Sequence, residues 1–294
     1  MEEFAYSDLA AECGAEREGG GIYVRKADAG GCEILRVQIK TQDAATRIGK
    51  PMGHYVTVEC GNLRELELLE LEHVRRALAV EIRDMAQSMC RCRIGKGFSV
   101  LVVGLGNAAV TADSLGPKTV KSLSVTRHIR KMEEVGFSVM GLCEIAALAP
   151  GVAGQTGMEA AELVRGAVAS VHPDLVVAVD ALAARSVKRL ASTVQLSDVG
   201  IQPGGGVGNA RWPLDKKSIG VPVMAVGIPT VVNSATLVRD SLRLAGYGEL
   251  SEELRETVAN GQSFFVSPKE IDLLVEAASL LLAQSLEKAF SFGM

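Results

Sequence analysis

The fold is decided by residues 98–118, Phe-Ser-Val-Leu-Val-Val-Gly-Leu-Gly-Asn-Ala-Ala-Val-Thr-Ala-Asp-Ser-Leu-Gly-Pro-Lys. The first six residues are apolar or small and do not alternate, which predicts a strand buried on both faces of a parallel sheet. Gly104 and Gly106 then let the backbone turn sharply. Asp113 follows, just before a helical segment that begins at Ser114. Because ligands gather at the carboxyl ends of strands in open α/β sheets, Asp113 is a candidate site residue.

Antiparallel strands are expected before this stretch. Residues 21–27 and 32–41 flank a turn at 28–31, and residues 54–60 alternate in the same way. A long helix is expected over 62–89, with Asn62 as its cap.

Strand-like and helix-like segments alternate after it. The expected strands are 137–143, 175–179, 193–196 and 221–226, and the expected helices are 114–130, 157–172, 182–190, 232–246 and 268–289. This alternation predicts a three-layer α/β/α fold around a mostly parallel or mixed central sheet. No repeat or linker interrupts the pattern, so we expect a short leader over residues 1–6 and one domain over 7–294. Residues 1–20, charged and ending in glycines, are interpreted as mobile.

Composition argues against two classes of protein. The formal net charge of −4 is unlike that of a nucleic-acid binder. No apolar run approaches the roughly 18 residues that span a bilayer, and the acidic N-terminus is unlike a signal peptide. We therefore expect a cytoplasmic protein without nucleic-acid or membrane partners.

The sequence also gives little support for a metal or a cofactor. Among the six cysteines only Cys90 and Cys92 are close together, and one C-x-C pair is weak evidence for zinc. The histidines lack metal-ligand spacing, and neither a P-loop nor a complete dinucleotide fingerprint occurs. We expect no metal and no cofactor.

Asp180 repeats the pattern of Asp113. It ends the apolar run that begins at Leu175 and precedes a good helix start. Two carboxylates side by side cannot both ionise easily, so one would hold a proton near neutral pH. Such a pair supplies an acid and a base, which can activate water and protonate a leaving amine. Helix caps are a competing interpretation that spacing alone leaves open. Arg185 is interpreted as a surface charge on the following helix.

Several ordered motifs resemble one family, the germination proteases of endospore-forming bacteria. They cover the chain from residue 98 to the C-terminus, and they are Val-Val-Gly-Leu-Gly-Asn (102–107), Asp-Ser-Leu-Gly-Pro-Lys (113–118), Val-Thr-Arg-His (125–128), Ala-Pro-Gly-Val with Gly-Gln-Thr-Gly (149–157), Asp-Ala-Leu-Ala-Ala-Arg-Ser (180–186), Pro-Gly with Gly-Val-Gly-Asn (203–209), Gly-Ile-Pro-Thr-Val-Val (227–232) and Ser-Pro-Lys-Glu (267–270).

The resemblance implies an unusual aspartic-type endopeptidase on a fold similar to hydrogenase-maturation proteases. It implies that Asp113 and Asp180 are the catalytic residues. It further implies that the substrates are small acid-soluble spore proteins of the spore core, and that the enzyme is a homotetramer made as an autoprocessed zymogen.

The leader and two differences from the family pattern bear on this resemblance. Ser7-Asp-Leu-Ala10 is similar to the stretch that follows the processing point, so cleavage is expected between Tyr6 and Ser7. The Glu3–Phe4 bond resembles the substrate pattern and competes with it. Asn233 stands where relatives typically have Asp, and the segment before Phe264 is short.

Two other functions stay open. In a metal-dependent endopeptidase of the hydrogenase-maturation type, His128 would help to engage a metal. Alternatively, the chain would bind spore proteins through its glycine-rich edge without cleaving them.

Overall fold

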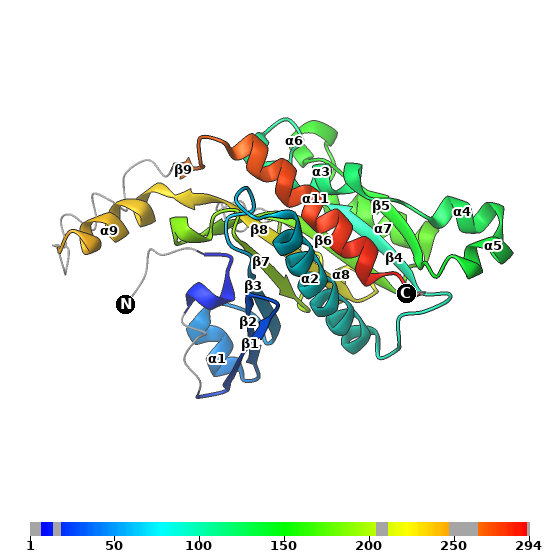
Figure 1. The fold of residues 1–294 in the computed structure, drawn as a ribbon, viewed down its shortest axis with the longest axis horizontal. Helices are drawn as coiled ribbons and strands as arrows, with labels where there is room; N and C mark the ends of the chain where they lie inside the picture. The colour runs from blue at the N-terminus through cyan, green and yellow to red at the C-terminus, as the bar shows by residue number, and fades with distance from the viewer. Residues whose placement is uncertain (1–6, 14–18, 204–210, 247–263, 293–294) are drawn as a thin grey trace.

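The computed structural model describes residues 7–13, 19–203, 211–246 and 264–292. The described strands form one nine-stranded sheet in the order β1-β2-β3-β7-β8-β6-β4-β5, with β9 paired to β8 (Figure 1). The strands are β1 (Ile22–Ala29), β2 (Cys32–Ile39), β3 (Gly53–Glu59), β4 (Ser99–Gly104), β5 (Glu144–Leu148), β6 (Leu175–Ala184), β7 (Thr193–Ser197), β8 (Val223–Asn233) and β9 (Phe265–Val266).

Helices cover both faces of this sheet (Figure 1). The α-helices are α1 (Gln42–Ile48), α2 (Leu68–Cys90), α3 (Leu115–Ser122), α4 (Arg127–Met132), α5 (Glu134–Val139), α6 (Ala153–Thr156), α7 (Ala160–Val171), α8 (Lys216–Ile219), α9 (Ser234–Leu244) and α11 (Ile271–Ala289), and the 3-10 helices are η1 (Ala10–Cys13), η2 (Thr111–Asp113) and η3 (Val187–Arg189). No helix within the described ranges combines the length and the apolar character needed to cross a membrane.

The parallel half of the sheet confirms the expected α/β fold. β5, β4, β6 and β8 run parallel to one another, and every residue of β4 is buried. Val100 and Val102 pack into the core that α2 and α11 cover, whereas Leu101 and Val103 pack into the core that α7 covers. The predicted strand buried on both faces is therefore confirmed, and it lies in the middle layer of three.

The antiparallel half is confirmed as well. β1 and β2 form the expected hairpin, and β3 pairs with β2 and then with β7, which joins the two halves. α1 packs beside them, with Ala44 and Ile48 in the same core as Leu35 and Tyr55. The long helix begins at Leu68 rather than at Asn62, with Glu67 and Glu70 forming a capping box.

Several expected boundaries are wrong. The strand expected over 137–143 is replaced by α5, and the strand itself begins at Glu144 beside β4. The helix expected over 182–190 does not form, because β6 continues to Ala184 along β8. The helix expected from residue 232 starts at Ser234, since β8 itself extends to Asn233. In the last two cases strand pairing overrides a short local pattern that fits both helix and strand, and in the first the same ambiguity is resolved in favour of a helix.

The N-terminal segment is packed against the sheet where residues 7–13 are described. Ser7 is 4% exposed, and Leu9 and Ala10 are fully buried. The interpretation of residues 1–20 as mobile is therefore wrong for this part of the chain. The expected leader over 1–6, including Tyr6 and the Glu3–Phe4 bond, lies outside the described residues, so the boundary at residue 7 stays a prediction.

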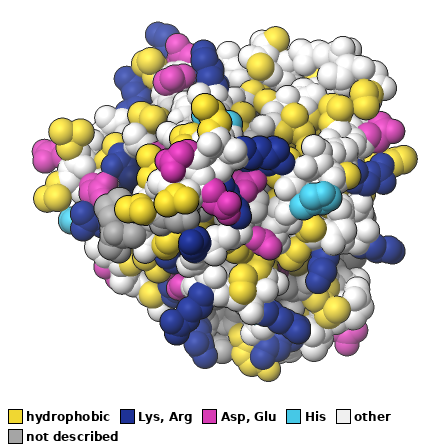
Figure 2. All heavy atoms as spheres, turned by 90° about the vertical axis from the view of Figure 1, so that its right-hand side faces the viewer, with side chains coloured by type: hydrophobic (Ala, Val, Ile, Leu, Met, Phe, Trp, Pro, Cys, Tyr) yellow, Lys and Arg dark blue, Asp and Glu magenta, His cyan; other side chains and the backbone are white. Residues whose placement is uncertain are grey.

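Figure 2 looks onto the end of the molecule that carries α4 and α5, at the right of Figure 1. Basic, acidic and hydrophobic side chains are interspersed on this face rather than separated into one charged surface. Met132, Val135 and Val139 are among its exposed apolar residues.

Candidate active site

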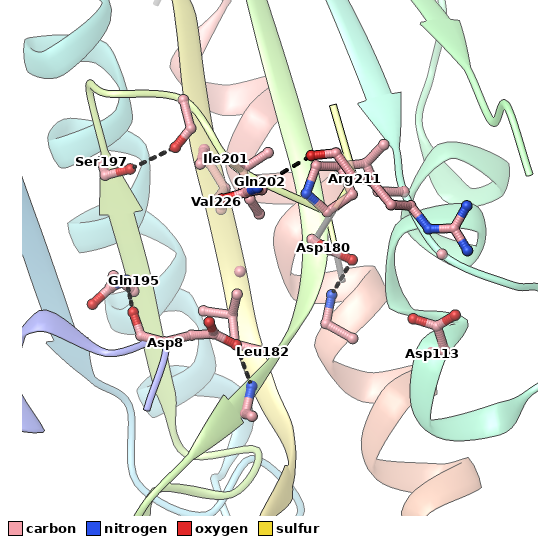
Figure 3. Close-up of a pocket in the computed structure, with 18 of the residues that line it drawn as sticks. Asp8, Asp113, Asp180, Leu182, Gln195, Ser197, Ile201, Gln202, Arg211 and Val226 are labelled. Carbon is pink, nitrogen blue, oxygen red and sulfur yellow. Dashed lines mark hydrogen bonds between the residues drawn. The ribbon is translucent and has the colours of Figure 1, made fainter. Parts of the chain in front are cut away.

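A pocket of about 1000 Å³ opens where β4 ends, beside the middle of β6 and β8 (Figure 3). Both aspartates singled out from the sequence, Asp113 and Asp180, line it. They come from different elements of the chain. The structure therefore brings together the two carboxylates that the sequence pattern proposed as a pair.

Asp180 lies within β6 rather than at its end. It is opposite Gly227 of β8, one residue beyond Val179, which pairs with Gly104 at the end of β4. The side chain is buried, and its Oδ1 accepts a hydrogen bond from the Ala181 N–H at 2.9 Å. The expectation that Asp180 ends a strand is therefore wrong, and so is the competing interpretation of Asp180 as a helix cap. It reaches the pocket because β4 stops while β6 continues.

Asp113 ends η2, and the cap of α3 is Ser114. The Asp113 Oδ2 accepts a hydrogen bond from the Asn107 N–H at 2.7 Å, so the carboxylate points back to the glycine-containing turn. Gly106 has φ +108°, and a Cβ there would lie 2.1 Å from the Asp113 carbonyl oxygen. The turn thus requires glycine, and Asp113, like Asp180, caps no α-helix.

Close packing of α3 holds the two aspartates on one side of the pocket. A Cβ on Gly116 would lie 2.3 Å from the Leu105 carbonyl oxygen and 2.6 Å from that of Val179. Only glycine allows the first turn of α3 to approach the end of β4 and the middle of β6 this closely. Asp113 consequently sits beside the strand that carries Asp180.

The environments of the two carboxyl groups differ in burial. Burial raises the pKa of Asp180 well above its usual value, the Asp113 carboxylate and Asp8 raise it further, and the Ala181 N–H opposes them. Burial also raises the pKa of Asp113, which is half-exposed, while the Asn107 N–H and Arg211 lower it. Of the two groups, Asp180 therefore holds its proton more strongly, and Asp113 ionises more readily.

Arg211 supplies positive charge to this pocket, and the sequence analysis missed it. Its guanidinium lies 3.7 Å from the Glu159 carboxylate, and its carbonyl accepts a hydrogen bond from the Gln202 side chain. Figure 3 shows Arg211 on the same side of the pocket as Asp113. No motif marked it, because it follows a glycine-rich stretch whose path the sequence does not define.

The start of the described chain forms another wall of the pocket. The Asp8 N–H donates to the Ala183 carbonyl at 2.9 Å, and the Ala183 N–H donates to the Asp8 carboxylate at 2.8 Å. Gln195 of β7 donates from Nε2 to the Asp8 carbonyl and accepts from the Ala10 N–H, at 2.8 and 2.6 Å (Figure 3). The chain directly after the predicted processing point is thus fixed in the pocket wall against β6 and β7. Sequence reasoning gave no role to Asp8 or Gln195.

Other residues considered from the sequence lie away from the pocket. His128 is exposed on α4, at the far end of the molecule, and Asn233 accepts a hydrogen bond from the Ala235 N–H at the start of α9. Arg185 follows β6 and lies on no helix, which corrects its expected position. The thiols of Cys90 and Cys92 are free. Within the described ranges, no three His, Cys, Asp or Glu residues are grouped to hold a metal ion.

Comparison with known proteins identifies the family. The family model described as germination protease matches residues 3–259. The chain belongs to the germination protease family. The germination protease of Caldanaerobacter subterraneus subsp. tengcongensis is 38% identical, over 95% of this chain and 91% of that protein. That of Clostridium acetobutylicum is 37% identical over 87% and 84%, respectively.

Other germination proteases match a smaller part of their own length. The Bacillus subtilis protein is 41% identical over 76% of this chain and 59% of its own. Among solved structures, a [NiFe] hydrogenase maturation protease HycI from Thermococcus kodakarensis covers 70% of this chain and 98% of its own, with 18% identity and a TM-score of 0.36. The chain is therefore a member of a family of proteases, and the resemblance seen in its motifs is confirmed.

Proposed function

We propose that this member of the germination protease family is an endopeptidase that hydrolyses small acid-soluble spore proteins during germination, using Asp113 and Asp180. The observation that carries the proposal is the presence of both carboxyl groups in one pocket of about 1000 Å³, with Asp180 buried and Asp113 half-exposed. Such a pocket has room for a peptide segment and a water molecule. The substrate class follows from the family resemblance.

The unequal environments divide the chemistry between the two residues. Ionised Asp113 accepts a proton from a water molecule as the water oxygen attacks the carbonyl carbon of the substrate. Protonated Asp180 donates its proton to the nitrogen of the peptide bond. The carbon–nitrogen bond then breaks, and the amine leaves in neutral form. Arg211 favours the ionised form of Asp113. No metal or cofactor takes part in these steps.

We also propose that the chain is made as a zymogen that cleaves itself between Tyr6 and Ser7. Ser7 and Asp8 line the same pocket as the two aspartates, which supports cleavage directly before Ser7. The Glu3–Phe4 bond is the competing cleavage point. Mass spectrometry of the mature N-terminus should show a chain that begins at Ser7, and an uncut chain would contradict self-processing.

The central test is cleavage of a purified small acid-soluble spore protein. Wild type should cleave it, whereas Asp113→Asn and Asp180→Asn should each lose about 10³-fold or more in kcat/KM, because each removes the acid or the base. Asp84→Asn is the matched control, since Asp84 is exposed on α2 and does not line the pocket. Full activity in either pocket variant would contradict the assignment. Loss of wild-type activity with a chelator would instead favour the metal-dependent alternative, and a stable uncleaved complex would favour the binding protein.

A further inference from the structure

Thr230 occupies an irregular position in β8. Along the pairing of β6 with β8, Leu182 lies opposite Pro229 and Ala183 lies opposite Val231. Thr230 is therefore the extra residue of a β-bulge, with no partner on β6. Bulges bend a strand and turn one side chain in a direction that regular pairing would not allow, and they occur often beside active sites.

The bulge turns the Thr230 side chain toward the segment that carries Asp113. The Thr230 hydroxyl donates a hydrogen bond of 2.7 Å to the carbonyl of Ala112, the residue directly before Asp113. Thr230 is 2% exposed, and both it and Ala112 line the pocket. Water cannot readily replace such a bond, so the hydroxyl is the group that fixes this carbonyl.

This hydrogen bond links η2, which carries Asp113, to β8, which pairs with the strand that carries Asp180. β8 pairs directly with β6 at Asp180, whereas Asp113 belongs to η2, a short 3-10 helix outside the sheet. The Asn107 N–H holds the carboxylate of Asp113, but Thr230 holds the backbone of η2 to the sheet. A shift of η2 would move Asp113 relative to Asp180 without changing either residue.

We infer that Thr230 is a positioning residue, which sets the place of Asp113 relative to Asp180 through its hydrogen bond to the Ala112 carbonyl. The inference rests on the proposed function of the two aspartates. It assigns the bulge in β8 a role in catalysis that is distinct from substrate binding. Its effect should therefore appear in kcat and not in KM, because misplacing a catalytic group by about 1 Å can cost about 100-fold in rate.

The experiment measures kcat and KM of the full chain on a purified small acid-soluble spore protein for Thr230→Val and Thr230→Ser. Valine keeps the shape and removes the hydroxyl, whereas serine keeps the hydroxyl and removes the methyl group. We expect Thr230→Val to lower kcat about 10- to 100-fold, with KM changed less than about twofold, and Thr230→Ser to stay within about threefold of wild type. If the valine variant does not fold, Thr230→Ala replaces it and is compared with Thr230→Ser, which differs by the hydroxyl alone.

Three results would overturn the inference: an unchanged kcat without the hydroxyl, an effect confined to KM, or a serine variant as impaired as the variant without a hydroxyl. Asp113→Asn is measured in parallel to separate this inference from the proposed function. If Asp113→Asn is inactive while Thr230→Val equals wild type, only the role of Thr230 is wrong. If Asp113→Asn is fully active, the proposed function of the aspartates is wrong.

Discussion

Asp113 and Asp180 are the same kind of residue in two different settings. Asp180 is 7% exposed within a central strand, opposite Gly227, and its position is fixed by pairing on the β8 side. Asp113 is half-exposed on a short 3-10 helix, and individual contacts with Asn107 and, through Ala112, Thr230 hold it in place.

This difference shows how one pocket can give two identical carboxyl groups different tendencies to ionise. Burial penalises the charged form of Asp180, so its proton stays bound while Asp113 ionises. β6 holds Asp180 rigidly, and η2 keeps Asp113 close to water. The comparison can be broken by separating the two groups, by replacing the buried carboxyl group, or by removing the cation beside Asp113.

Gly116→Ala is expected to have the largest effect on the arrangement of the two groups. The new Cβ would lie within 2.6 Å of three backbone atoms of Leu105 and Val179, so α3 must move away from the strands. Overpacking of this kind costs about 1–3 kcal/mol of unfolding free energy, and the displaced Asp113 should lower kcat about 100-fold. Thermal unfolding and peptide cleavage measure the two effects.

Gly166→Ala is the matched control for this change. Gly166 lies in α7, and a Cβ there would meet no atom within 4 Å. Alanine should stabilise the helix by roughly 0.5–1 kcal/mol and leave kcat unchanged. An equal loss of activity in both variants would show that the close approach of α3 does not matter.

An intermediate effect is expected from Asp180→Asn on the pH dependence of stability. Because the folded pKa of Asp180 is raised, the unfolded chain ionises first, and ionisation favours unfolding. The unfolding free energy of wild type should therefore fall relative to the variant as pH rises from about 4 through the folded pKa. Each unit between the two pKa values is worth about 1.4 kcal/mol.

Urea unfolding of both proteins at a series of pH values gives this difference. Asp84→Asn, exposed on α2, controls for the loss of one carboxylate. A constant difference between wild type and Asp180→Asn across this pH range would mean that burial does not hold the proton on Asp180.

The smallest effect is expected from Arg211→Gln. Arg211 lowers the pKa of Asp113, so its loss should raise that pKa and shift the acid limb of the kcat/KM profile to higher pH. At pH values below the pKa of Asp113, kcat/KM should fall by at most about tenfold, whereas at higher pH it should change little. Arg25→Gln, at an exposed position on β1, is the control. An unchanged profile would remove Arg211 from the electrostatics of the pocket.

The sequence predicted the central strand, the α/β fold and the meeting of Asp113 and Asp180 in one pocket, because apolar runs and the residues after them follow from local chemistry. It predicted the wrong surroundings for Asp180, since the length of β6 depends on pairing with a strand almost 50 residues later along the chain. The contacts that Asp8, Gln195 and Thr230 make in the pocket were not predicted. Their places depend on a docked N-terminal segment and on a bulge, and neither leaves a local pattern.

The most direct test of the account is the titration of the aspartate side chains by ¹³C NMR, with Asp113→Asn and Asp180→Asn used to assign the two signals. The account predicts that Asp113 ionises first, that Asp180 keeps its proton to clearly higher pH, and that Asp113→Asn lowers the pKa of Asp180 because a neighbouring negative charge is lost. Independent ionisation of both groups near pH 4, the ordinary value for an exposed aspartate, would contradict it.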